Sequence, residues 1–288
     1  MNEGSVAAFA RGFIAVHGID CAKRLSTIGP TIGLAIEEVD ADNFEGALVR
    51  AAGIPRGTIL VNRAIREPAR KLFTIAHEVG HYVLPDHGDK AAPCGQKDVE
   101  NFDQRIAKRE HEANLFAAEL LMPEEIVRPL GARDPSFTVV EELAASCGTS
   151  LTASAYRLVD RSTHALALVW STGGQVRWYH RSEEFRPKIR VDELSSATVA
   201  ADYFRNGDSP PEGWVQVPAE AWLYADALRE GATLQEWTRH LPSYDATLTL
   251  LHATAFIEAR HDYEDPDDGE LDPKEFSLER NRWPSKKG

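Results

Sequence analysis

The chain has 288 residues, 43% of them hydrophobic, which is enough for one large domain or two modest domains with separate cores. Its 45 acidic and 32 basic residues give a formal net charge of −13, so we expect neither a nucleic acid nor an anionic membrane as a direct partner. Its longest apolar run, residues 165–170, is far shorter than the roughly 20 residues that a membrane-spanning helix needs.

The N-terminal sequence and the cysteines together indicate a cytoplasmic protein. Residues 1–13 lack the basic segment and the continuous apolar core of a signal peptide. The chain has only three cysteines, and they form no Cys-x-x-Cys pair: Cys21, Cys94 and Cys147. This usage is typical of a reducing compartment, and it argues against a disulfide framework and against a thiolate zinc cluster.

The first half of the chain predicts a small sheet with helices around it. Apolar residues at helical spacing predict a helix over residues 6–16. A helix is expected over residues 68–83, because Pro68 suits a first helical turn and Pro85 ends the apolar pattern. A longer helix is expected over residues 99–122. Short aliphatic runs predict three strands, at residues 33–39, 46–51 and 58–62.

The second half predicts a helical pair followed by a mixed α/β region. Helical patterns at residues 139–147 and 151–159 are joined by a Gly-Thr turn, an arrangement of the helix-turn-helix type. Residues 165–170 and 175–180 flank a Ser-Thr-Gly-Gly turn, which predicts a β-hairpin. From residue 262 the chain is polar and proline-punctuated, as a mobile tail would be. The remaining expected elements are helices at 195–204 and 234–240 and a strand or buried helix at 246–251.

The sequence His77-Glu78-Val79-Gly80-His81 falls inside the helix expected over residues 68–83. Residues four apart lie on one face of a helix, so two imidazoles in this pattern can bind a single Zn²⁺. The glutamate between them then stands beside a water molecule on the metal. The motif by itself is also compatible with two ordinary helix histidines, one exposed and one half-buried.

A zinc site of this kind needs a third protein ligand, and Glu110 is the candidate. It falls within the inward stripe of the helix expected over 99–122, about 40° from Ile106, whereas His111, Glu112 and Glu119 point to other faces. Burying an ionised carboxylate alone is unfavourable, and a divalent cation held by two histidines would compensate it. The alternative is an ion pair with a basic residue such as Arg70 or Lys71. The stripe itself consists of Ile106, Ala113, Ala117 and Leu120.

The expected chemistry is peptide-bond hydrolysis. Zinc lowers the pKa of its bound water and polarises the scissile carbonyl, and Glu78 accepts the proton and passes it to the departing amine. The strand at 58–62 precedes the site helix, so we expect its edge to pair with an extended substrate backbone. Gly80 either allows a neighbouring element to approach closely or is only a weak point in the helix. Past Pro85 we expect a solvated loop, with a supporting role at the site as the alternative, at Asp86, His87 and Asp89.

Two segments together resemble a known family. RKLFTIAHEVGHYVL (residues 70–84) and REHEANLFAAELLMP (residues 109–123) are similar to the paired signature of the ImmA/IrrE metallopeptidases, an HExxH helix followed by E-x-E-A-N-x-F-A-A-x-L-L-M-P. The resemblance covers roughly residues 45–162. It implies that Glu110 completes the zinc site, in agreement with the periodicity. It further implies that the partner is an Xre-type helix-turn-helix repressor, inactivated to switch on stress-response or mobile-element genes.

We therefore expect an α+β chain in four parts. Some relatives implied by the resemblance carry a GAF-like sensor domain in the C-terminal half, where tryptophans either line a pocket or belong to the core: Trp170, Trp178, Trp214 and Trp222. The four parts are a zincin-like metallopeptidase domain (1–130), a helical segment of the helix-turn-helix type (131–162), a mixed C-terminal domain with a sensory role as one option (163–261), and a flexible tail, acidic then basic (262–288).

Three functions are compatible with this sequence. The first is a cytoplasmic zinc endopeptidase of narrow specificity, with His77, His81 and Glu110 binding the metal and Glu78 as general base. The second is a regulatory protein that keeps a structural metal site and sequesters its repressor without cleaving it. The third is a DNA-binding regulator that uses residues 139–159, which supply only Arg157 as a basic side chain in the second helix and therefore favour a scaffold role.

Overall fold

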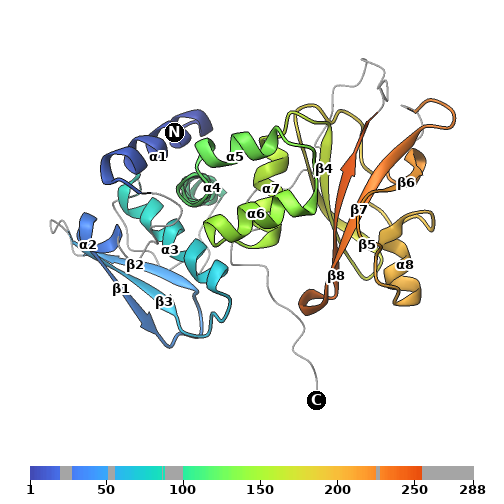
Figure 1. The fold of residues 1–288 in the computed structure, drawn as a ribbon. Helices are drawn as coiled ribbons and strands as arrows, with labels where there is room; N and C mark the ends of the chain where they lie inside the picture. Colours follow the sequence, from blue (N-terminus) through green and yellow to red (C-terminus); the bar gives the residue numbers. More distant parts are fainter. Residues whose placement is uncertain (20–27, 51–55, 86, 88–99, 225–227, 255–288) are drawn as a thin grey trace. The chain divides into compact units, whose positions relative to one another are not determined.

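The computed structural model describes residues 1–19, 28–50, 56–85, 87, 100–224 and 228–254 (Figure 1). The described chain forms two compact units, the first from residues 1–124 and 144–150 and the second from residues 125–143 and 151–254. Among the helices in these ranges, none combines the length and the apolar character needed to cross a bilayer. The architecture is α+β, as predicted.

The first unit is a three-stranded mixed sheet with helices packed on it. Its elements run in the order α1 (Glu3–His17), α2 (Ile28–Ile32), β1 (Leu34–Val39), β2 (Gly46–Arg50), β3 (Gly57–Asn62), α3 (Pro68–Val83) and α4 (Glu100–Leu121). Helix α3 contacts β2 and β3 and lies between the sheet and α4 (Figure 1). The three predicted strands and the predicted helices over 68–83 and 99–122 are confirmed to within a residue at each end.

Strand β3 lies at the centre of this sheet, so the prediction that its edge receives a substrate backbone is wrong. The strand order is β1-β3-β2, with β3 parallel to β1 and antiparallel to β2. Both sides of β3 are therefore occupied by backbone hydrogen bonds, and the side chains of Ile59 and Val61 are fully buried. The prediction failed because a short run of aliphatic residues is equally typical of a central strand, which is buried on both faces.

Helices α3 and α4 approach closely because α3 carries a glycine at the contact. A Cβ placed on Gly80 would lie 3.2 Å from the Cα of Ala113 and 3.2 Å from Cδ1 of Phe116. The close-approach interpretation of Gly80 is thus the correct one. The stripe predicted for α4 is buried at Ala113, Ala117 and Leu120 but not at Ile106, which is 37% exposed, because only the C-terminal half of α4 is covered on most sides.

The second unit is built on a five-stranded antiparallel sheet. The strand order is β5-β4-β8-β7-β6. The predicted hairpin is confirmed as β4 paired with β5, and its turn places Gly173 and Gly174 at positive φ. The elements that lie wholly or mostly in this unit are α5 (Glu124–Gly131), α6 (Phe137–Cys147), α7 (Leu151–Asp160), β4 (Leu166–Thr172), β5 (Gln175–Arg181), α8 (Val199–Asn206), β6 (Val215–Pro218), β7 (Thr233–Leu241) and β8 (Ala246–His252).

One predicted helix of this unit is a strand. Residues 234–240 belong to β7, which is hydrogen-bonded to β6 on one side and to β8 on the other. Its two faces are both buried, at Glu236 and at Trp237, so the apolar and polar residues do not alternate cleanly. Glu236 is buried because it accepts hydrogen bonds from the backbone N–H of Ala200 (2.9 Å) and from Nε1 of Trp222 (2.9 Å). Because Glu236 interrupts the apolar residues of β7, their spacing resembled that of a helix.

Candidate metal centre

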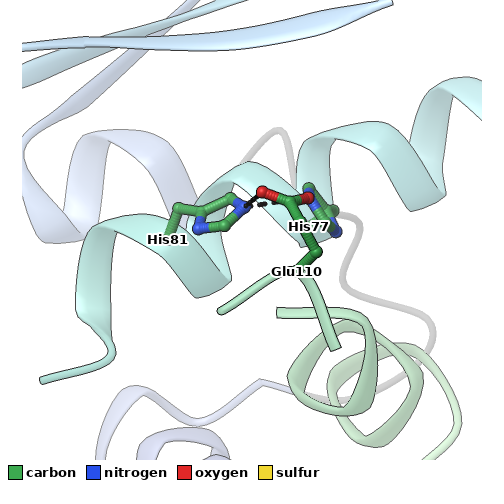
Figure 2. Close-up of side chains that lie close together, drawn as sticks. All are labelled: His77, His81 and Glu110. Carbon is green, nitrogen blue, oxygen red and sulfur yellow. Dashed lines mark hydrogen bonds and ion pairs between the residues drawn. The ribbon is translucent and has the colours of Figure 1, made fainter. Parts of the chain in front are cut away.

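Three ligand-type side chains converge where α3 and α4 pack together. Figure 2 shows His77 and His81 projecting from α3 toward Glu110 of α4. The two Nε2 atoms are 3.0 Å apart, as expected for residues four apart on one helix face. Nε2 of His77 lies 3.1 Å from Oε2 of Glu110, and Nε2 of His81 lies 3.3 Å from Oε1 of the same carboxylate. Among the described residues this is the group whose ligand atoms all lie within 4.8 Å of one another.

The spacing and the donor types fit Zn²⁺. A tetrahedral zinc ion with bonds of about 2.0–2.1 Å holds its ligand atoms about 3.3 Å apart, close to the 3.0–3.3 Å observed between these side chains. Two imidazole nitrogens and one carboxylate are a ligand set of catalytic zinc sites, which keep a fourth position for water or substrate. The same residues can hold a divalent metal other than zinc, since the geometry does not select among them.

Hydrogen bonds outside the cluster orient the two imidazoles. Nδ1 of His77 lies 2.8 Å from Oδ1 of Asn114, an acceptor, so this nitrogen carries the proton and Nε2 of His77 keeps its lone pair toward the cluster. Nδ1 of His81 lies 3.0 Å from Nδ1 of His87. Nε2 of His87 in turn lies 2.9 Å from Oε2 of Glu112.

Sequence reasoning missed Asn114 and Glu112 in this outer set of residues, and it gave His87 a supporting role only as an alternative. The prediction of a solvated loop after Pro85 is wrong at His87, whose side chain is 0% exposed, and the alternative of a supporting role at the site is the one that its burial favours. Its burial depends on how the turn after α3 lays it against α4, which no local pattern encodes. Asn114 lies four residues after Glu110, on the same helix face, so helical periodicity was a signal that could have found it. Asp86 and Asp89 fall outside the described residues.

The carboxylate of Glu110 pairs with the histidines and not with the basic residues considered as alternatives. Nε of Arg70 donates to Oε2 of Glu45 at 2.8 Å, and Nζ of Lys71 donates to Oε1 of Glu38 at 2.8 Å. Burial acts to raise the pKa of Glu110, but the hydrogen bonds and charges of the two histidines outweigh burial and hold this pKa well below its usual value. Glu110 is therefore ionised at neutral pH, as a metal ligand must be.

Metal binding to this cluster should weaken in acid. Burial acts to lower the pKa of His77, yet the carboxylates of Glu110 and Glu78 outweigh burial and raise it above its ordinary value in the metal-free chain. Protons compete with the metal for the neutral imidazole, so the metal stays bound somewhat below the metal-free histidine pKa and is released at lower pH, where the protons outcompete it. We expect zinc occupancy to fall as the pH drops below about 6 in equilibrium dialysis. Full retention at a pH of about 4 would contradict this expectation.

Glu78 lies beside the cluster with an unusual protonation equilibrium. It is buried, at 7% exposure, and burial raises its pKa above the ordinary glutamate value, although the nearby histidines oppose this. The backbone N–H of Leu48 in β2 donates a hydrogen bond to its carboxylate. A buried carboxylate that lies beside a metal site without belonging to the ligand cluster is suited to accept and return a proton.

Comparison with known proteins found a family model that covers the region of this site. Residues 31–159 match the family model of the IrrE N-terminal-like domain. The radiation response metalloprotease IrrE of Deinococcus deserti is 30% identical over 153 residues, which are 53% of this chain and 53% of that protein. The IrrE of Deinococcus radiodurans is 33% identical over 159 residues, 53% of this chain and 47% of that protein. The chain thus spans about half the length of the curated relatives it matches.

A solved structure shares the fold over a longer stretch. A Mycobacterium tuberculosis transcriptional regulator superposes with a TM-score of 0.54 over 91% of this chain and 93% of its own, at 14% sequence identity, which is evidence for the fold alone. The family-model match covers both α3 and α4. Residues 31–159 therefore match an IrrE N-terminal-like domain, and over about half of its length the chain is a distant homologue of two proteins named radiation response metalloprotease IrrE.

Proposed function

We propose that this chain is a zinc-dependent endopeptidase that acts in the cytoplasm on a specific protein. In this proposal His77, His81 and Glu110 bind the metal and Glu78 is the general base. The observation that carries it is the convergence of two α3 imidazoles and one α4 carboxylate within 3.3 Å of one another, with a second acid, the buried Glu78, beside them. The zincin-like character of the first unit is part of the same proposal, since it rests on this site.

The residues around the site divide the chemistry between them. A zinc ion bound there would act as a Lewis acid toward the scissile carbonyl and would acidify a water molecule. His77 and His81 hold their Nε2 atoms in place through bonds at Nδ1. The carboxylate of Glu78 accepts the proton of the attacking water and returns it to the leaving amine.

Strand β2 positions Glu78 for this role. The N–H of Asn62 donates to the carbonyl of Glu45, so in the antiparallel pair the backbone groups of alternate residues face β3 and those of Gly46 and Leu48 face away from it. The outward N–H of Leu48 is the one that reaches Glu78. A backbone donor on a sheet is a rigid support, because it cannot rotate away as a side chain can.

Gly46 of β2 should be essential for this placement. A Cβ added there would lie 2.5 Å from Cγ2 of Thr74 and 3.0 Å from Oε1 of Glu78, so Gly46→Ala must shift either the strand or the glutamate. We expect the cleavage rate to fall by up to about 100-fold with zinc still bound, since misplacement by about 1 Å has this effect on catalysis. Gly12→Ala in α1, where a Cβ has open space, is the control. An unchanged rate for Gly46→Ala would show that Glu78 does not need this position.

The proposed activity can be tested without knowing the substrate. The purified chain, loaded with zinc, is incubated with a peptide library, and products are identified by mass spectrometry. We expect a narrow set of cleavages that disappears after treatment with 1,10-phenanthroline and returns when zinc is added back. Absence of cleavage both in the library and in a panel of helix-turn-helix repressors would refute the endopeptidase proposal.

The proposed substrate is a helix-turn-helix transcriptional repressor. The net charge of −13 suits a basic DNA-binding partner, and the names of the relatives, which include a radiation response, fit a role in stress-response regulation. A panel of small helix-turn-helix repressors from the same organism is incubated with the zinc-loaded chain. We expect one of them to be cut at a single site. If all stay intact while library peptides are cut, the repressor proposal fails and the peptidase proposal stands.

A further inference from the structure

We propose that His87 and Glu112 are positioning residues for His81, fixing the proton of its imidazole on Nδ1 so that Nε2 is presented to the metal. The proposal deepens the proposed function and rests on it, since it assumes that His81 binds a metal ion. It assigns a role to a histidine of the loop after α3 and to a second acid of α4, neither of which belongs to the ligand cluster.

The three side chains form a continuous row of hydrogen bonds. Nδ1 of His81 is 3.0 Å from Nδ1 of His87, and Nε2 of His87 is 2.9 Å from Oε2 of Glu112. The row is shielded from solvent, because the side chain of His87 is 0% exposed and that of Glu112 is 6% exposed. Bonds in such surroundings hold side chains in place more firmly than bonds at the surface do.

The chemistry of these groups fixes the direction of every bond. An ionised carboxylate only accepts, so Nε2–H of His87 donates to Glu112. A neutral imidazole has one donor and one acceptor, so Nδ1 of His87 must accept. The only group in the row that can donate to Nδ1 of His87 is the Nδ1–H of His81. The remaining nitrogen of His81, Nε2, therefore carries a lone pair, and this is the atom 3.3 Å from Oε1 of Glu110.

Helix α4 would then support both histidine ligands and supply the third ligand itself. Asn114 holds Nδ1 of His77 directly, at 2.8 Å. Glu112 lies two residues from Glu110, about 200° around the helix, and so cannot reach the cluster on its own. His87 bridges this distance. Such a carboxylate, acting on a ligating histidine through a second group, orients the ring and raises its basicity.

The expected consequence is a loss of metal affinity. Removing a residue that supports a ligand lowers metal affinity by about 10–100-fold. We therefore expect His87→Ala to weaken zinc binding by this factor in a competition titration of the full chain against a fluorescent chelator. Glu112→Gln keeps the size of the side chain and an accepting oxygen but loses the charge, so its effect should be smaller. His111→Ala removes a neighbouring histidine of α4 that contacts Glu3 instead, and serves as the matched control.

A spectroscopic readout separates positioning from general stability. In the zinc-loaded wild type, we expect the side-chain Nδ1–H protons of His77 and His81 to be observable by NMR and protected from solvent exchange. In His87→Ala the His81 proton should lose protection while the His77 proton, held by Asn114, keeps it. A variant that only destabilised the fold would affect both protons alike.

Each outcome decides the inference. Weaker zinc binding together with selective loss of the His81 proton supports it. Wild-type affinity in His87→Ala and Glu112→Gln overturns it and leaves the proposed metal site intact. If His87→Ala does not fold, the NMR spectrum of the zinc-loaded wild type decides. A proton on Nε2 of His81, or metal coordination through Nδ1 of His81, overturns the inference. A wild-type chain that binds no zinc removes the proposed function and this inference together.

Discussion

Replacement of Glu78 by glutamine is expected to reduce cleavage by about 100- to 10,000-fold, the contribution typical of a general base, while zinc stays bound. The expected loss follows from the position of this side chain, which lies beside both histidines and is held by the backbone of β2 without belonging to the ligand cluster. Glutamine has nearly the same shape and can still accept the hydrogen bond from Leu48. Glutamine cannot take a proton from water, so we expect the rate of the hydrolysis step to fall while zinc binding is unchanged.

The experiment compares cleavage rate and zinc content in the same preparations. Glu67→Gln is the matched control, because Glu67 precedes α3, is exposed and makes no side-chain capping bond. Its rate and zinc content should equal those of the wild type. Full activity in Glu78→Gln would contradict the assignment of the base. A variant without cleavage that still inactivates a repressor would support the alternative, in which the chain sequesters its partner without cutting it.

The part of the fold that the sequence predicts best is the part with strong helical periodicity. Helix α3 was predicted with the bounds that the structure has, since a proline marks each end. The convergence of His77, His81 and Glu110 was predictable for a similar reason, because a pair four residues apart and a carboxylate in an inward stripe are both consequences of helix geometry.

The features that sequence reasoning missed depend on contacts between distant segments. The central place of β3 follows from which strands flank it, and a short aliphatic run carries no information about its neighbours. Strand β7 was mistaken for a helix because Glu236 is buried by partners from two other elements. Glu112 was placed correctly on another face of α4. Its link to the site through His87 was not foreseen, because it requires the turn after α3 to return to that face.

Replacement of Glu110 by alanine is expected to remove most of the metal affinity, by more than about 100-fold, which exceeds the effect of a supporting residue. Glu110 is the only contribution of α4 to the described ligand cluster, and its loss leaves two histidines on one helix. Two imidazoles alone do not complete the three-ligand set of a catalytic zinc site. The helix itself should persist, because alanine favours helix and the packing of α4 at Ala113 and Phe116 is untouched.

His111→Ala is again the suitable control, since His111 neighbours Glu110 in sequence but contacts Glu3 instead of the cluster. The decisive measurement is the zinc content of the purified wild type and of Glu110→Ala by elemental analysis after the same dialysis. We expect about one zinc ion per wild-type chain and close to none in Glu110→Ala, as a three-ligand site requires. Equal zinc in the two proteins, or no zinc in the wild type, would contradict the metal centre from which the proposed activity follows.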